Sequence, residues 1–205
     1  QFQAQYRLVQ SLALNDALRA EKIHEGHANA VLNDYVRLNP SYETFLLVDT
    51  EGNYLASNDL TAEGRKLPTS RLRSRNYANA AWFRAAMNGS YTEDKKKNLS
   101  GAFVEDAQID PVSSAFYGEN RFGLSYTTLV KTCRGAVTGV LTARVGFDWV
   151  ESELKNFYET LKSQGFSSAG IDLLNKSGFY LVHSDPKQTA RDLENTILKQ
   201  NITST

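Results

Sequence analysis

The stretch Thr44 to Ser57, TFLLVDTEGNYLAS, decides the fold of this chain. It is an apolar run, a turn centred on Asp49-Thr50-Glu51-Gly52, and a second apolar run that ends in Ser. Glycine supplies the positive φ that a tight turn needs, so the stretch predicts two antiparallel strands, 45–49 and 53–57, joined as a hairpin. The same pattern recurs at Gly170 to Ser184, GIDLLNKSGFYLVHS, which predicts a second hairpin and suggests two related modules.

The residues before the first hairpin show helical periodicity. Apolar side chains recur at spacings of three and four over 2–38, and no proline interrupts them before Pro40. A single helix over this range would be roughly 55 Å long, at about 1.5 Å per residue. Two interpretations stay open: a helix packed on its own sheet, and a helix that also pairs with a second protomer and continues into a membrane span before Gln1.

Strands and short helices alternate irregularly after the first hairpin. A basic polar loop is expected at 61–75, a short helix at 79–87 and a polar run at 88–100. Two long strands, 122–130 and 136–145, flank a turn at Arg134-Gly135, and a helix follows at 149–164. This order predicts an α+β fold with a long N-terminal helix packed on an antiparallel sheet, and not the alternating βαβ pattern of nucleotide-binding folds.

Composition narrows the function classes. The 205 residues carry 23 basic and 23 acidic side chains, so no net charge attracts nucleic acid or an anionic membrane. Cys133 is the single cysteine, which rules out an internal disulfide framework and a Cys-rich metal site. No run of 18 apolar residues is present to span a bilayer. We expect the chain to be a fragment of a longer protein, anchored to a membrane by flanking segments.

Catalytic and metal-binding patterns are weak. The sequence has no G-x-S-x-G motif, no P-loop and no Cys/His pair at catalytic spacing. His24 and His27 lie three residues apart, but no acidic partner is specified beyond Glu21 and Glu25. We therefore expect no enzyme, no cofactor and no metal.

The order of these segments resembles the Cache class of extracytoplasmic sensor domains, which occur in chemotaxis receptors, sensor histidine kinases and receptor-type diguanylate cyclases. The resemblance rests on the long helix, FLLVDTEGNYLAS, WFRAAMNGSYTED, FGLSYTTLVKTCRGAVTGVLTARVGFDWVESEL and GIDLLNKSGFYLVHSD, and covers nearly the whole chain. It implies a PAS-like sheet and a double-Cache organisation. The expected divisions are a helix at 1–39, a membrane-distal ligand-binding module at 40–164 and a smaller membrane-proximal module, short for a full fold, at 165–205.

The resemblance also implies a pocket between the sheet and the helix-bearing insert. In amino-acid-binding members an Arg precedes a Trp-aromatic pair, which points to Arg73 or Arg75 and to Trp82-Phe83, although the spacing here is longer. Arg144 stands where those members carry an amine-binding Asp. An inward Arg144 binds a carboxylate and repels an ammonium, which favours an organic acid over a plain amino acid.

Every one of these residues has a structural interpretation beside the functional one. Trp82 and Phe83 fit a core, and Arg144 could face solvent from an alternating strand. Asp106, Gln108 and Asp110 belong to a polar insert, which is a solvated loop or a polar pocket wall, with Asp106 the candidate for the wall. Further candidates either donate to a bound carboxylate or complete the insert: Tyr117, Arg121 and Tyr126.

The sequence thus favours a non-enzymatic, periplasmic or extracellular sensor domain of a membrane receptor, most simply a chemotaxis receptor. It would bind a small organic ligand and form a homodimer through its N-terminal helix, with no role for nucleic acid. The alternatives are the sensor of a histidine kinase or diguanylate cyclase, a structural or protein-binding module without a small ligand, and a secreted enzyme domain.

Overall fold

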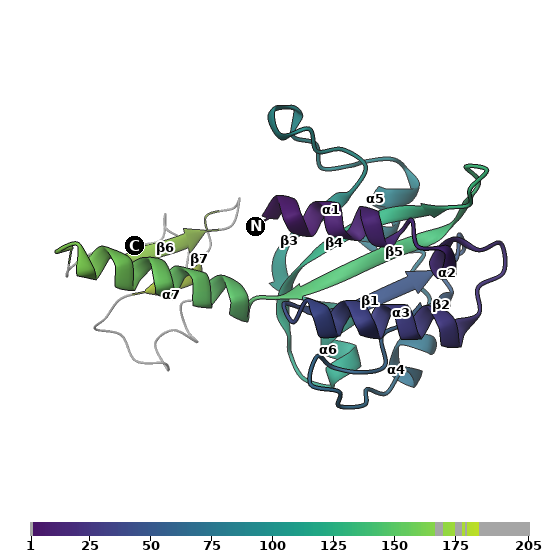
Figure 1. Ribbon diagram of the computed structural model, residues 1–205, viewed down its shortest axis with the longest axis horizontal. Helices are drawn as coiled ribbons and strands as arrows, with labels where there is room; N and C mark the ends of the chain where they lie inside the picture. The colour runs from purple at the N-terminus through teal and green to yellow at the C-terminus, as the bar shows by residue number, and fades with distance from the viewer. Residues whose placement is uncertain (1, 167–169, 175–177, 179, 185–205) are drawn as a thin grey trace. The chain divides into compact units, whose positions relative to one another are not determined.

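The computed structural model describes residues 2–166, 170–174, 178 and 180–184 of the chain (Figure 1). Its contacts divide the chain into two units, Gln1–Gly146 and Phe147–Thr205. The helices and strands of the first unit are α1 (Phe2–Leu12), α2 (Asp16–Arg19), α3 (Glu25–Leu38), β1 (Tyr42–Val48), β2 (Tyr54–Ser57), α4 (Ser70–Arg73), α5 (Ala81–Met87), the 3-10 turn Lys95–Lys97, β3 (Phe103–Ile109), α6 (Pro111–Tyr117), β4 (Phe122–Lys131) and β5 (Val137–Gly146).

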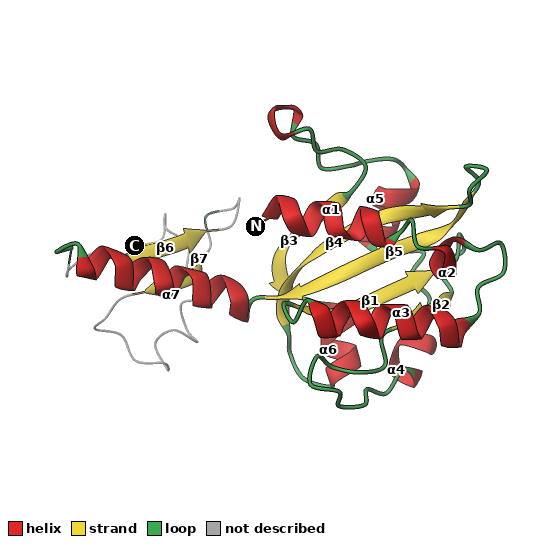
Figure 2. Cartoon of the chain, viewed as in Figure 1, coloured by secondary structure: helices red, strands yellow, loops and turns green. Residues whose placement is uncertain are grey.

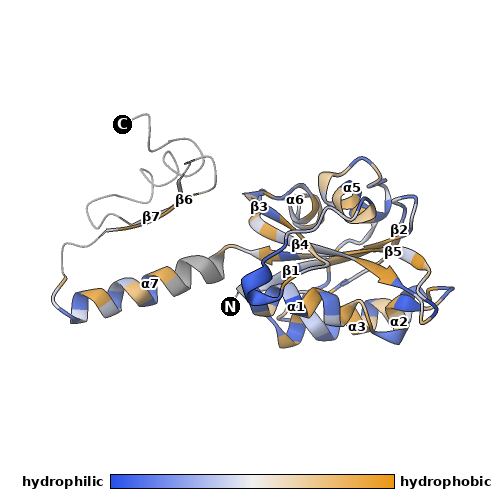
Figure 3. Cartoon of the chain, turned by 90° about the horizontal axis from the view of Figure 1, so that it is seen from above, coloured by the Kyte–Doolittle hydropathy of each residue, from blue (hydrophilic) through white to orange (hydrophobic). Residues whose placement is uncertain are grey.

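The first unit is built on a five-stranded sheet in the order β2-β1-β5-β4-β3 (Figure 2). Each neighbouring pair of strands is antiparallel. Helices α1, α2 and α3 lie over one face of the sheet, and α5 and α6 lie over the other (Figure 3). The predicted α+β class, with N-terminal helical structure on a PAS-like antiparallel sheet, is confirmed.

The N-terminal segment is not the single long helix that its periodicity predicts. A turn follows α1, and Asn15 has an extended backbone and accepts a hydrogen bond from the Ala17 amide, which starts α2. His24 caps α3 in the same way. The longest strands have 10 residues and span roughly 33 Å, so a straight 55 Å helix would run past the sheet. The breaks allow α1 and α3 to cover one face together.

The predicted hairpins are present. Gly52 has φ +80° in the turn between β1 and β2, and Gly135 has φ +86° between β4 and β5, as turns built on glycine require. The short helix with Trp82 and Phe83 is α5. The polar insert contains more regular structure than the sequence analysis expected, because β3 extends the sheet and α6 covers it.

The second unit begins with α7 (Asp148–Ser163), which the sequence analysis predicts as a helix but groups with residues 40–164. It continues with β6 (Ile171–Leu174) and β7 (Tyr180–Ser184), an antiparallel pair with Gly178 at φ +81°. The other residues of that predicted turn, 175–177 and 179, and the segment 185–205 lie outside the described residues. The smaller module at 165–205 stays a prediction.

Candidate functional site

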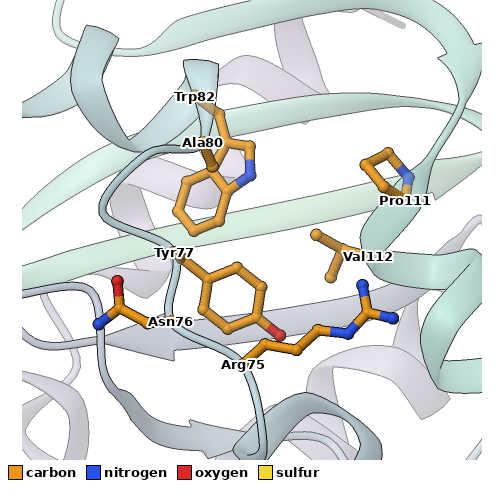
Figure 4. A pocket seen from close by; sticks show the side chains of 7 residues that line it. All are labelled: Arg75, Asn76, Tyr77, Ala80, Trp82, Pro111 and Val112. Atoms are coloured by element: carbon orange, nitrogen blue, oxygen red, sulfur yellow. The ribbon is translucent and has the colours of Figure 1, made fainter.

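A cavity of about 420 Å³ lies on the face of the sheet that carries α5 and α6 (Figure 4). One wall is the segment that leads into α5, and the opposite wall is the start of α6. Its volume falls within the range of small-molecule sites in proteins. The lining residues are Arg75, Asn76, Tyr77, Ala80, Trp82, Pro111 and Val112.

The first wall is fixed to the turn between β1 and β2. The Asn76 side-chain amide donates to the Glu51 carbonyl at 3.0 Å and to the Asn53 side-chain oxygen at 2.9 Å. The Tyr77 amide donates to the Gly52 carbonyl at 2.8 Å. The hairpin recognised in the sequence therefore positions two lining residues of the cavity.

Tyr77 gives the cavity a buried neutral ring. Its hydroxyl donates to the Leu72 carbonyl at 3.1 Å. Burial raises the pKa of Tyr77 to about 12, although the nearby Arg75 and Arg144 charges act in the opposite direction. The ring is therefore an uncharged wall at neutral pH.

Arg75 is the one charged residue among the seven that line the cavity. Its side chain is exposed and forms no hydrogen bond or ion pair with any residue that the structure describes. In the view of Figure 4 its aliphatic chain passes the Tyr77 hydroxyl and its guanidinium lies on the Val112 side of the cavity. An unpaired guanidinium at the rim of an apolar cavity can bind a carboxylate. Arg75 is one of the residues proposed from the sequence as a ligand contact, and the structure places it on the lining of this cavity.

Trp82 and Phe83 have different roles. Trp82 is 2% exposed and lines the cavity, and Tyr77 lies against it with ring centroids 5.7 Å apart. Phe83 packs edge-on against Trp82 at 6.0 Å and belongs to the hydrophobic core without lining the cavity. The aromatic pair predicted from the sequence thus supplies one wall residue and its support.

Arg144 points toward this face of the sheet but is already paired. Its side chain is 2% exposed, and Nη1 donates to Asp110 Oδ1 at 2.9 Å and to Glu105 Oε2 at 3.2 Å. Its guanidinium lies 5.2 Å from the centroid of the Trp82 ring. Its Nε and Nη2 atoms are buried without a partner among the described residues. The inward orientation was one of the two predicted; the two acidic partners were not predicted.

Tyr126, a candidate donor to a bound carboxylate in the sequence analysis, does not lie on the face of the sheet that carries Arg144 and Trp82. In β4, Ser125 stands opposite Arg144, and Tyr126 stands opposite Ala143. Successive residues of a strand point to opposite faces, so Tyr126 faces the side covered by α1 and α3. It is 1% exposed there, and burial raises the pKa of its hydroxyl.

Three further predicted residues lie away from the cavity. A register shift in β3 between Glu105 and Gln108 leaves Asp106 exposed, where its side chain accepts a hydrogen bond from the Ala107 amide. Tyr117 and Arg121 form a separate cluster, in which the guanidinium stacks 4.5 Å from the tyrosine ring. Both contact Glu43: the Tyr117 hydroxyl donates to its carbonyl, and Arg121 pairs with its carboxylate at 3.2 Å.

The sequence analysis missed the acidic partners of Arg144. Asp110 accepts hydrogen bonds from the Val112 and Ser113 amides and so caps α6. An acidic residue directly before a proline is a recognisable helix start, because proline suits the first helical position. That signal could have identified Asp110 and α6. Glu105 carries no comparable local signal.

Two further observations concern metal binding and membrane-spanning helices. Across the described ranges, no three His, Cys, Asp or Glu side chains lie close enough together to hold a metal ion. None of the helices within these ranges combines the length and apolar composition needed to cross a membrane.

Comparison with known proteins gives structural neighbours only. No protein-family model and no curated protein sequence matches the chain. The chain is similar to the ligand-binding domain of the Pseudomonas aeruginosa amino acid chemoreceptor PctC in complex with GABA. The TM-score is 0.59 at 18% identity, over 97% of this chain and 71% of that one.

Two other solved structures are similar. The ligand-binding domain of the Pseudomonas fluorescens chemoreceptor CtaA, in complex with L-serine, has a TM-score of 0.54 at 16% identity over 97% of this chain and 67% of that one. An extracellular ligand binding receptor from Desulfohalobium retbaense has a TM-score of 0.64 at 14% identity, over 99% of this chain and 30% of that one. At these identities the TM-scores show the fold alone, which is that of chemoreceptor ligand-binding domains, as the Cache resemblance predicts.

Proposed function

We propose that this chain is the ligand-sensing domain of a membrane receptor and that a small organic molecule binds in the cavity beside Trp82. The observation that supports it best is the cavity itself: a preformed, mostly apolar space with one unpaired guanidinium, in a fold whose neighbours PctC and CtaA are chemoreceptor ligand-binding domains. Those neighbours are named for binding and not for catalysis, which is compatible with a sensor. The sensor would lie outside the cytoplasm, as the Desulfohalobium retbaense neighbour is described as an extracellular ligand binding receptor.

The preferred ligand in this proposal is a small organic acid. Its carboxylate would pair with Arg75, and its apolar body would contact Trp82, Tyr77 and Val112. None of the seven lining residues is acidic, so an ammonium placed there would lose water without gaining an anionic partner. GABA and L-serine, named with PctC and CtaA, both carry an amino group, so the proposal departs from these neighbours.

A thermal-shift series tests both parts of this proposal. The ligands are small aliphatic and aromatic monocarboxylates, their neutral amides and the corresponding α-amino acids. A ligand at 100 times its Kd adds about 2.7 kcal/mol to stability, which raises the Tm of a domain of this size by roughly 5 to 10 °C. We expect the acids to give the largest shifts. No shift with any class would instead favour a module that senses a partner protein.

Arg75→Gln isolates the charge at the rim. Because Arg75 is exposed, its loss should weaken acid binding by only about fivefold, equivalent to about 1 kcal/mol, and should leave amide binding unchanged. Arg84→Gln is the matched control, since Arg84 is also exposed on the neighbouring helix but does not line the cavity. Equal losses in the two variants would contradict the assignment of Arg75.

The predicted homodimer has less support than the ligand. The apolar stripe of α1 that motivated it is covered by the chain's own sheet, with Tyr6, Val9 and Leu12 at most 2% exposed. Among the described residues of the N-terminal segment, the exposed large apolar side chains are Leu14, in the turn after α1, and Leu38, at the end of α3. Sedimentation equilibrium at high protein concentration tests the dimer, which Leu14→Glu would weaken if the turn after α1 takes part.

A further inference from the structure

Arg144 touches both walls of the cavity from behind without lining it. The Trp82 ring, on the α5 wall, lies 5.2 Å below its guanidinium. Asp110, which accepts from Nη1 at 2.9 Å, caps α6 directly before the lining residues Pro111 and Val112. One side chain on the central strand β5 is therefore connected to both walls.

Charge argues against a direct role of Arg144 in binding an anion. One guanidinium already faces the two carboxylates of Glu105 and Asp110, whose side chains are 17% and 4% exposed. A ligand carboxylate at the remaining Nε and Nη2 edge would be the third anion around a single positive charge. Arg75 has no such competitors among the described residues.

We propose that Arg144 is a positioning residue: it sets the spacing between Trp82 and the start of α6, and so the width of the cavity, while Arg75 carries the charge recognition. The expected effect of Arg144 on ligand binding rests on the proposed function. The expected effect on the spacing between Trp82 and α6 does not. Two charge-assisted hydrogen bonds fix the guanidinium plane, and that plane then restricts the Trp82 ring.

The test must separate positioning from stability. Arg144→Met alone leaves two largely buried carboxylates without a cation, which is expected to be strongly destabilising. The triple variant Arg144→Met, Glu105→Gln, Asp110→Asn removes all three charges together, and Asn still accepts hydrogen bonds at a helix start. The sequence contains two tryptophans, Trp82 and Trp149. The parent and all variants therefore carry Trp149→Phe, so that the fluorescence comes from Trp82.

The primary readout is acrylamide quenching of Trp82 fluorescence, measured beside the urea midpoint. We expect a folded triple variant with a midpoint near that of its parent, because buried ion pairs are often replaceable at little cost. Its quenching constant should rise severalfold. A matched removal of another ion pair, Arg121→Met with Glu43→Gln, should leave quenching unchanged. Unchanged quenching in the triple variant, or an equal rise in the control, would overturn the inference.

Arg144→Lys keeps the inference testable if the triple variant does not fold. Lysine retains the charge for both carboxylates but not the planar group over Trp82. Quenching should rise in this variant too, by less than in the triple variant. Parent-like quenching would count against the positioning role.

A ligand experiment then distinguishes positioning from anchoring. Loss of Arg144 in the triple variant should weaken the binding of an acid and of its neutral amide by a similar factor. We expect about tenfold, or about 1.4 kcal/mol, for each ligand. Arg75→Gln should weaken the acid alone. An acid-selective loss in the triple variant would show that Arg144 binds the carboxylate and would refute the inference. If no ligand binds the parent, the proposed function fails, while the quenching result still decides the inference.

Discussion

Gly52 joins the β1–β2 turn to the residues that line the cavity. Its carbonyl accepts from the Tyr77 amide, and its own φ is +80°. A Cβ atom there would lie 2.3 Å from the Ala78 nitrogen, far inside contact distance. Both the backbone conformation and the close approach therefore require glycine at this position.

Gly52→Ala should destabilise the protein more than Gly64→Ala. Gly64 has a similar φ of +83°, but nothing lies within 4 Å of its Cβ position. Gly64→Ala therefore measures the cost of placing alanine in the left-handed conformation by itself, about 1 to 2 kcal/mol. Gly52→Ala should add about 1 to 3 kcal/mol for the clash. Urea unfolding of both variants measures the difference, and equal losses would mean that the Ala78 backbone moves away freely.

Tyr77 should make the protein sensitive to alkali. Its pKa is raised to about 12 by burial, so the folded state keeps the proton where the unfolded state loses it. Its contribution is fully present below pH 10 and is lost as the pH rises through about 12. The free energy of unfolding should fall across this window by up to about 1.4 kcal/mol per pH unit for this group.

Tyr77→Phe should make the alkaline decline shallower. It should not abolish it, because burial raises the pKa values of Tyr42 and Tyr126 as well. Urea unfolding at a series of alkaline pH values gives the slope. An unaltered slope in Tyr77→Phe would contradict the assignment of this titration to Tyr77.

At the scale of elements, the N-terminal helices show how local capping divides a periodic segment. Leu18, Leu32 and Val36 keep their side chains at most 1% exposed although they belong to different helices. The breaks do not interrupt the apolar pattern, because α1, α2 and α3 bury their stripes on the same face of the sheet (Figure 3). The division depends on the polar groups at the breaks, of which Asn15 and His24 are the caps.

Asn15→Ala should cost about 1 kcal/mol, the usual cost of losing a side-chain helix cap. The side chain of Asn15 accepts from the Ala17 amide at 3.0 Å, and alanine cannot replace this bond. Asn88→Ala provides the comparison, since the exposed Asn88 ends α5 without a side-chain hydrogen bond to any described residue. Chemical denaturation should show a clear loss for the first variant only.

At the scale of the whole molecule, the first unit contains all the structure that forms the cavity. The five-stranded sheet, the helices on both of its faces and the seven lining residues all belong to Gln1–Gly146. The ligand experiments therefore concern this unit.

A fragment ending at Gly146 should fold by itself. It keeps a complete sheet and the buried core on both of its faces, and a domain of this size can be stable alone. We expect a single cooperative urea transition and a circular dichroism spectrum with the helix and strand signals of this unit. A fragment without a cooperative transition would show that residues after Gly146 contribute to the fold.

The sequence by itself determined the elements whose signals are local. Glycine turns at 52 and 135, alternation in β4 and β5, and the helical spacing of α5 and α7 involve neighbours only a few positions apart. Two residues that line the cavity, Arg75 and Trp82, could be singled out as candidates because they lie close to one such element, α5.

Only the tertiary structure decided what the site residues do. Arg144 finds its carboxylates 34 and 39 positions away, so nothing near it in the sequence shows that its charge is already matched. The bulge in β3 turns Glu105 inward and leaves Asp106 exposed, and strand register places Tyr126 on the opposite face. These outcomes depend on pairing between distant strands, in which a shift of one residue reverses the face of every side chain.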